Sequence, residues 1–302
     1  MANYPAQVKI VEVGARDGLQ NESSVSTVAK IALVNALADA GLKHIEAGAF
    51  VSPKWVPQMA DSSDVIQGFV RRDGVEISAL TPNLKGAELA LANEVDEFAI
   101  FTAASEAFTQ KNINCSIEES IERFRPVVEL AQKNNIKVRG YVSCVVGCPY
   151  QGEVEPEQVL SVCKQLLALG CYEISLGDTI GVGTANQVRQ LLTLLLSHIP
   201  AERLAVHFHD TYGQALANIH TALDMGIATI DSAVAGLGGC PYAKGASGNV
   251  ATEDVVYLLQ GLGIDSGIDL ERLAKAGWQI CEALDKAPVS KVSLALKNSC
   301  QS

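Results

Sequence analysis

The sequence has few aromatic residues, few charges and no long hydrophobic run. Aromatic residues make up 5% of the 302 residues and charged residues 19%, whereas hydrophobic residues make up 48%. The core must therefore be mostly aliphatic, as it is in a sheet covered by helices on its outer side. The longest apolar runs are well short of the ~18 residues that a membrane-spanning helix needs, so we expect no membrane span.

Positive charge is also scarce. The chain has 23 lysine and arginine residues against 34 aspartate and glutamate residues, and its formal net charge is -11. A diffuse acidic surface repels nucleic acid and anionic membranes, so we expect neither as a partner. The first seven residues contain no apolar or arginine-rich segment of the kind found in signal and transit peptides. We therefore expect no leader peptide.

The eight cysteines show no spacing that is typical of a metal site or a disulfide framework. In a chain of this length without a secretory signal, free thiols in a reducing compartment are expected. Cys144 and Cys148 form one isolated pair, and Pro149 follows directly. We interpret the pair as buried thiols rather than as a zinc knuckle.

The sequence does contain a repeated alternation of short β-rich runs and helical stretches, which predicts parallel strands with helical crossovers. Turn residues separate the runs, and helix-capping residues such as Ser116 and Gly41 mark several helix ends. The expected strands are residues 8–14, 44–50, 76–81, 97–102, 137–144, 172–179, 204–210 and 229–235. The clearest expected helices are residues 28–40, 117–134, 156–169, 187–198 and 214–225.

Eight such units of roughly 30 residues give the ~250 residues of a closed (β/α)8 barrel. The alternative is an open doubly wound sheet, which usually has a glycine-rich phosphate loop after its first strand. Here the first strand is followed by Ala15-Arg16-Asp17-Gly18, which is not such a loop. We predict an α/β fold, a (β/α)8 TIM barrel with extra C-terminal helices. Residues 1–302 would form a single catalytic domain, with the barrel over about 8–264 and the helical extension over about 265–302.

Active sites of such barrels lie at the C-terminal ends of the strands. The polar residues that the predicted strands place there are Arg16, Asp17, Glu46, Asp178, Thr179, His207, His209 and Asp210. Arg16 follows a central strand, where it could stabilise a developing oxyanion; a surface cation is the alternative.

The pair His207 and His209 is the strongest signal among these residues. In a strand, residues two apart project to the same face, so both imidazoles can bind one metal ion. Two separate core or capping histidines are the alternative. Asp17 is the natural carboxylate partner, although Asp-Gly is also a common turn dipeptide. Two imidazoles, a carboxylate and an amide oxygen suit Mg²⁺ or Mn²⁺ better than a thiolate site would, and zinc is a further option.

A glycine-rich loop over residues 236–249 follows the eighth strand and could act as a lid. Its cysteine, Cys240, could serve as an acid or a base if a nearby charge lowers its pKa; a connector with an incidental thiol is the alternative. Asn249, at the end of the loop, could cap the next helix, or its amide oxygen could bind a metal ion.

Several of these motifs resemble the 3-hydroxy-3-methylglutaryl-CoA (HMG-CoA) lyase family, within the TIM-barrel metallolyase superfamily. The resemblance extends from about residue 8 into the helical tail. The motifs that carry it are residues 8–22, 50–59, 177–184, 207–215 and 236–249.

The resemblance implies a carbon–carbon lyase that cleaves HMG-CoA to acetyl-CoA and acetoacetate by metal-assisted retro-Claisen cleavage, in leucine degradation and ketone body formation. It implies Mg²⁺ or Mn²⁺ on Asp17, His207, His209 and Asn249. It also implies an acyl-CoA substrate and a homodimer. Eukaryotic members usually begin with a mitochondrial leader. Because we expect no leader in this chain, we expect a bacterial cytoplasmic enzyme.

For catalysis, the resemblance carries roles over onto Arg16, Glu46 and Cys240. We expect Arg16 to stabilise the enolate oxygen, Cys240 to protonate the enolate carbon, and Glu46 to orient Arg16 or the metal ligands. Asp17, His207 and the Cys240 thiolate stay open as the base for the 3-hydroxyl group.

Three alternative functions are open on the same residues. The first is a lyase for a longer 3-hydroxy-3-alkylglutaryl-CoA, such as 3-hydroxy-3-isohexenylglutaryl-CoA. The second is a synthase that runs the reaction toward condensation, which the lid loop and the lack of a regulatory domain disfavour. The third is a non-catalytic metal- or CoA-binding protein, which would leave Arg16 and Cys240 without a purpose.

Overall fold

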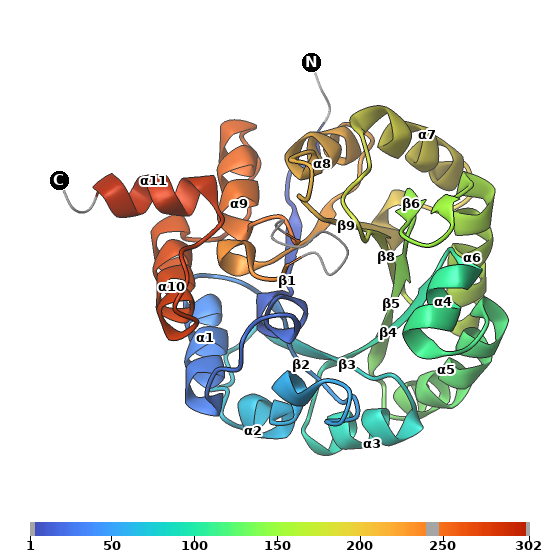
Figure 1. Cartoon of the computed structure of the whole chain (residues 1–302), viewed down its shortest axis with the longest axis horizontal. Coiled ribbons are helices and arrows are strands. Elements are labelled where there is room, and N and C mark those ends of the chain that lie inside the picture. Colours follow the sequence, from blue (N-terminus) through green and yellow to red (C-terminus); the bar gives the residue numbers. More distant parts are fainter. Residues whose placement is uncertain (1–3, 240–247, 300–302) are drawn as a thin grey trace.

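The computed structural model describes residues 4–239 and 248–299 of the chain. Eight parallel strands close into a barrel in the order β1-β10-β9-β8-β5-β4-β3-β2, with helices around it (Figure 1). The strands are β1 Lys9–Glu12, β2 His44–Ala49, β3 Glu76–Leu80, β4 Glu97–Ala103, β5 Lys137–Ser143, β8 Glu173–Asp178, β9 Leu204–Phe208 and β10 Thr229–Ser232. Each lies within or nearly within one predicted run, so the prediction of a TIM barrel with C-terminal helices is confirmed.

The helices form an outer ring that covers the apolar outer face of the barrel strands (Figure 1). They are α1 Thr27–Asp39, α2 Ser62–Gln67, α3 Leu84–Ala92, α4 Glu106–Ile113, α5 Ile117–Lys133, α6 Pro156–Leu169, α7 Ala185–Leu196, α8 Ala215–Asp224, α9 Thr252–Gly261, α10 Leu270–Ala283 and α11 Lys291–Ser299. Ser116 caps the start of α5 as predicted, and it does so in a capping box: the Ser116 side chain accepts from the backbone N–H of Glu119, and the Glu119 carboxylate accepts from the backbone N–H of Ser116. None of the helices in these residues is long and apolar enough to cross a membrane.

The first strand is shorter than predicted, and its early end shapes the site. Residues 13 and 14 were expected to be in the strand, but β1 ends at Glu12 and a turn of π-helix, η1 Gly14–Gly18, follows. The buried Glu12 carboxylate accepts hydrogen bonds from the backbone N–H groups of Gly14 (2.7 Å) and Val234 (2.9 Å). These bonds turn the chain at the strand end, so that Arg16 and Asp17 lie on a compact turn rather than in a flexible loop.

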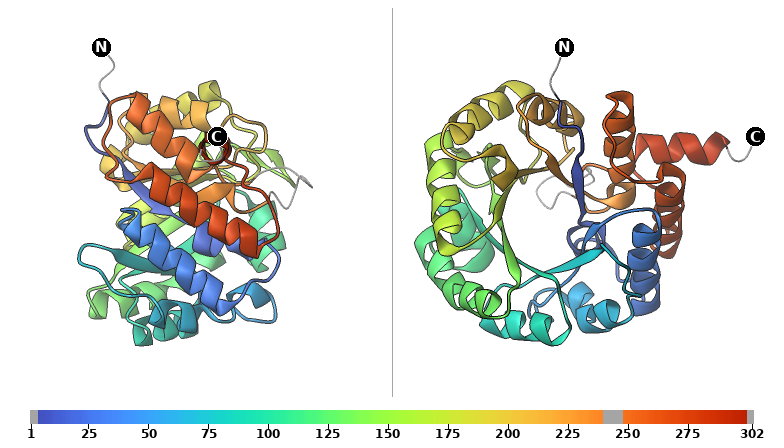
Figure 2. Two further views of the ribbon diagram at one scale, coloured as in Figure 1. Left: turned by 90° about the vertical axis from the view of Figure 1, so that its left-hand side faces the viewer. Right: turned by 180° about the vertical axis from the view of Figure 1, so that it is seen from behind.

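The extra C-terminal helices pack against the outside of the barrel. Helix α10 lies along α1, as Figure 2 shows. The backbone N–H of Asp269 donates to the carbonyl of Ala40 (2.8 Å) just after α1. Gly41 comes next with φ +104°, and a Cβ there would lie 2.4 Å from the carbonyl oxygen of Gly267. The predicted glycine at the end of α1 is therefore required both by its conformation and by the close approach of the extension.

The described cysteines are free thiols, and Cys144 and Cys148 are buried as predicted. Cys148 lies in a small antiparallel hairpin, β6 Gly147–Cys148 and β7 Gly152–Glu153. Its Sγ accepts a hydrogen bond of 3.0 Å from the Ser105 hydroxyl. Within the described ranges, no cysteine belongs to a cluster that could hold a metal ion.

Candidate metal centre and active site

Asp17, His207 and His209 lie together at the C-terminal end of the barrel. One potential ligand atom from each lies within 4.8 Å of the other two. His207 is in β9 and His209 follows the end of that strand, so the spacing of two residues directs both imidazoles inward. Nε2 of His207 lies 4.0 Å from an oxygen of Asp17, which the turn η1 supplies from the end of β1, the strand on the other side of β10 from β9. The three side chains form the potential metal cluster of the described chain.

The protonation states of Asp17 and His209 suit metal binding. Burial would raise the pKa of Asp17, but the charges of Arg16 and the two histidines outweigh burial and hold the pKa at about 2. Burial, with His207 nearby, lowers the pKa of His209 to about 4. At neutral pH Asp17 is therefore ionised and His209 is neutral, which are the forms that bind a cation.

The two histidines differ in what their Nδ1 atoms contact. Nδ1 of His207 lies 3.2 Å from Oδ2 of Asp231. Nδ1 of His209 is buried and has no hydrogen-bond partner among the described residues. Burial would lower the pKa of His207, but the hydrogen bond and charge of Asp231 and the charge of Asp17 raise it overall. A buried ring nitrogen without a partner calls for an ion or a water molecule, so the residues present fit a cation.

Arg16 lies beside this cluster and is itself buried. Its Nη1 donates to Asp17 (2.6 Å), and its Nε donates to Glu46, which the predicted second strand directs into the barrel. The second oxygen of Glu46 accepts from the Tyr141 hydroxyl of β5. Burial would lower the pKa of Arg16, but the charges of Glu46 and Asp17 raise it well above the usual value. The site therefore holds a fixed positive charge next to the metal cluster.

Asn249 also reaches the cluster. Its Nδ2 donates to Asp17 Oδ2 (2.9 Å) and to the Leu237 carbonyl (3.3 Å). The alternative that Asn249 caps a helix is wrong, because α9 begins at Thr252 and its N-cap is Ala251. Cys240, the predicted catalytic cysteine, lies outside the described residues.

Three polar residues expected at the strand ends hydrogen bond to the backbone of nearby turns. The Asp178 carboxylate accepts from Gly183 (2.8 Å). The Thr179 hydroxyl accepts from the backbone of Cys144 (2.9 Å). Asp210 accepts from the backbone of Ala215 (2.9 Å). These side chains shape the rim of the barrel and are not members of the metal cluster.

The charged residues inside the barrel were not predicted from the sequence. Arg139 of β5 is fully buried and donates to Asp231 of β10 and to Glu173 of β8. The signal was present, because each charge lies in a run that otherwise reads as a buried strand. Burial would raise the pKa of Asp231, but Arg139 and the hydrogen bond to His207 hold it well below its usual value.

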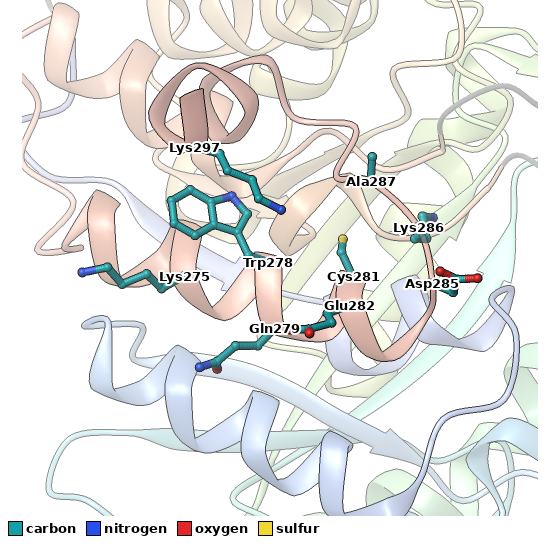
Figure 3. A pocket seen from close by; sticks show the side chains of 9 residues that line it. All are labelled: Lys275, Trp278, Gln279, Cys281, Glu282, Asp285, Lys286, Ala287 and Lys297. Carbon is teal, nitrogen blue, oxygen red and sulfur yellow. The ribbon is translucent and has the colours of Figure 1, made fainter. Parts of the chain in front are cut away.

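An open groove lies outside the barrel, on the C-terminal helices (Figure 3). Trp278 and Lys275 of α10 contribute to its wall, and Lys297 of α11 lies beside Trp278. None of the residues that line the groove belongs to the metal cluster. The other lining residues are Gln279, Cys281, Glu282, Asp285, Lys286 and Ala287.

The chain matches known proteins over nearly its whole length. The HMGL-like family matches residues 7–280. A Pseudomonas aeruginosa protein named 3-hydroxy-3-isohexenylglutaryl-CoA/hydroxy-methylglutaryl-CoA lyase is 60% identical over 295 residues, 97% of this chain and 98% of that protein. The mitochondrial hydroxymethylglutaryl-CoA lyase of Rattus norvegicus is 59% identical over 296 residues, 98% of this chain and 91% of that protein. The crystal structure of hydroxymethylglutaryl-CoA lyase from Pseudomonas aeruginosa has a TM-score of 0.97 and 59% identity, and the match covers 98% of this chain and 99% of that one. The chain therefore belongs to the HMGL-like family, which confirms the resemblance seen in its motifs.

Proposed function

We propose that this chain is a metal-dependent carbon–carbon lyase that cleaves HMG-CoA to acetyl-CoA and acetoacetate, a step of leucine degradation. The names of its relatives support the reaction, and the cluster of Asp17, His207 and His209 beside the buried Arg16 carries the proposal. The reaction needs an acidified tertiary hydroxyl group and a positive charge for an enolate oxygen, and these four side chains can meet both needs.

The metal ligands in this proposal are Asp17, His207, His209 and Asn249, and the metal is Mg²⁺ or Mn²⁺. The carboxylate and amide oxygens are ligands that suit such an ion, and the two imidazoles complete the set. Asn249 now directs its amide nitrogen at Asp17; ligation through Oδ1 requires the amide to turn over. When bound, the divalent cation supplies Lewis acidity to substrate oxygens.

The charges and hydrogen bonds of the other side chains indicate which group stabilises the enolate and which group is the base. Arg16 stabilises the enolate oxygen, and its ion pair with Glu46 holds the guanidinium in place. Asp17, with a pKa of about 2, is a weak base at neutral pH. His207 has no free lone pair when Nε2 is a ligand and Nδ1–H donates to Asp231. The base for the hydroxyl group is therefore the Cys240 thiolate, and the thiol formed when it takes the proton can then give that proton to the enolate carbon.

A second substrate class has a specific observation in its favour. The relative from Pseudomonas aeruginosa is named for 3-hydroxy-3-isohexenylglutaryl-CoA as well as for the methyl compound. The identities of 60% to that protein and 59% to the rat enzyme are too close to separate the two substrates. A panel of 3-alkyl chain lengths, compared by kcat/KM, distinguishes them.

We propose that residues 1–302 form one catalytic domain, with the barrel over about 8–264 and the extension over about 265–302, and that the enzyme is a bacterial cytoplasmic homodimer. The packing of α10 on α1 supports the single domain. The free thiols of the described cysteines suit a reducing compartment. Light scattering during size-exclusion chromatography measures the oligomeric state, and a monomeric mass would contradict the dimer.

The test of the function is acetoacetate release from HMG-CoA by protein stripped of metal with a chelator, before and after Mg²⁺ or Mn²⁺ is added. We expect activity only with metal, and none in the His209→Ala variant. His198→Ala is the matched control, because His198 is an exposed histidine outside the site. Wild-type protein that releases no acetoacetate under any metal condition would refute the proposal.

A further inference from the structure

Asp231 lies in the barrel interior, directly beside His207. The register of β10 on β9 pairs the two residues, and their side chains meet at 3.2 Å between Oδ2 and Nδ1. The carboxylate is about 1% exposed. A buried carboxylate at this distance fixes the orientation of the imidazole ring.

The other neighbours of Asp231 determine which nitrogen of His207 carries the proton. Oδ1 accepts from Arg139 Nη2 (2.7 Å), and Oδ2 accepts from Arg139 Nη1 (3.1 Å) and from the Ser175 hydroxyl (2.6 Å). Arginine keeps its charge in proteins and has only donors. The carboxylate therefore stays an acceptor toward the imidazole, and Nδ1 of His207 must be its protonated nitrogen. The lone pair is then on Nε2, the atom 4.0 Å from Asp17.

Arg139 in turn is held by a second carboxylate. Its Nε donates to Glu173 (2.7 Å), which also accepts from Lys9 (2.8 Å) and from the Thr229 hydroxyl (3.1 Å). These residues come from different strands of the barrel. The position of Asp231 is therefore set by several strands at once.

We propose that Asp231 is a positioning residue of the metal centre, which fixes the tautomer and the ring orientation of His207, while Arg139 holds Asp231 in place. The proposal rests on the proposed function, because it takes His207 as a metal ligand. Outer-shell partners of this kind change metal affinity 10- to 100-fold in other proteins. His209 has no such partner among the described residues, so the effect is assigned to His207 alone.

The variant Asp231→Asn preserves size but cannot satisfy these neighbours. With its amide oxygen at the Oδ2 position, its NH2 group faces Nη2 of Arg139, donor against donor. With the amide turned over, the NH2 group faces Nδ1 of His207 and favours the tautomer whose proton is on Nε2. A protonated Nε2 has no lone pair for a cation. Either orientation disturbs the support of His207.

The experiment titrates metal-free protein with Mn²⁺ and follows binding by calorimetry and by the electron paramagnetic resonance of free Mn²⁺. We expect Asp231→Asn to bind Mn²⁺ about 10- to 100-fold more weakly than wild type. Glu173→Gln is the matched control: it removes a charge beside the same Arg139, but its amide oxygen can still accept from Arg139 Nε and so keep Arg139 in place. We therefore expect its affinity to stay within about threefold of wild type. Circular dichroism and Tm check that each variant is folded.

A second measurement does not depend on Asp231→Asn being stable, because it reads the tautomer in the wild-type protein. Nitrogen NMR of wild-type protein labelled in histidine reports the tautomer of His207, assigned by comparison with His207→Gln, and we expect the proton on Nδ1. Wild-type affinity in folded Asp231→Asn, an equal loss in Glu173→Gln, or a proton on Nε2 in the wild type would each overturn the inference while the proposed function stands. A wild-type protein that binds no Mn²⁺ would overturn both.

Discussion

Arg139 gives the sharpest prediction about stability, because it is a fully buried cation whose removal leaves two buried carboxylates. The change Arg139→Met keeps a long apolar side chain and deletes the three hydrogen bonds from the guanidinium to Asp231 and Glu173. Glu173 keeps Lys9 as a cationic partner. Asp231 keeps only the Ser175 hydroxyl and His207 as partners among the described residues.

The expected loss of stability follows from removing one partner of a buried ion pair while the other partner stays. Removing one partner typically destabilises a protein by about 3–5 kcal/mol, because the remaining charge stays buried without compensation. A domain is usually stable by only about 5–15 kcal/mol, so the variant should fold but unfold at a much lower urea concentration. The penalty should shrink as the pH falls, because the orphaned carboxylates can then take up protons.

The assay is urea unfolding of metal-free protein, followed by circular dichroism, so that metal binding does not add to stability. Arg125→Met is the matched control: Arg125 is an exposed arginine of α5 paired with Glu122, and its loss should barely move the midpoint. If Arg139→Met lowers the midpoint no more than Arg125→Met does, the internal charges are not a stabilising network and the reasoning is refuted.

Three further predictions concern the site and its surroundings. In Arg16→Lys, a single ammonium group cannot hold Glu46 and Asp17 as the guanidinium does. We expect kcat to fall about 10²- to 10³-fold with Mn²⁺ affinity nearly unchanged, and a wild-type kcat would contradict the enolate role. Burial raises the pKa of Glu12 to about 7 in the folded protein, whereas the pKa is near 4.5 in the unfolded chain. The folded state therefore binds the proton more tightly, and the stability that this proton gives is complete below pH 4.5 and is lost as the pH rises through 7. Glu12→Gln should therefore gain stability relative to wild type between pH 4.5 and 7, by up to about 3 kcal/mol at about 1.4 kcal/mol per unit of pKa; a pH-independent difference in urea unfolding would exclude this. Cys240→Ala should lose nearly all acetoacetate release and still bind Mn²⁺ normally, whereas turnover near wild type would remove the thiol from the mechanism.

The sequence predicted the barrel because each strand is a short β-rich run bounded by turn residues. The missed elements are those with weak local signals. Helix α2 has only 6 residues, and the strands of the β6–β7 hairpin have 2 each. Helix α7 begins two residues earlier than predicted, because Thr184 and Gln187 form a capping box at its start.

The site was predictable where it follows a local rule and hidden where it depends on strand register. His207 and His209 share a face because they are two residues apart in the chain. Asp231 lies beside His207 only because β10 pairs with β9 in one register. The bond from Arg16 to Glu46 depends on the turn η1, and the sequence predicted only that these residues follow the first strand, not how they turn.

The central claim is that one divalent cation binds among Asp17, His207 and His209 at the mouth of the barrel. The most direct measurement is a crystal structure grown with Mn²⁺, with anomalous diffraction data to locate the metal. The account predicts one strong anomalous peak within bonding distance of the Asp17 carboxylate and of one nitrogen from each histidine. A crystal with no peak at this cluster, or with the metal bound elsewhere, would contradict it.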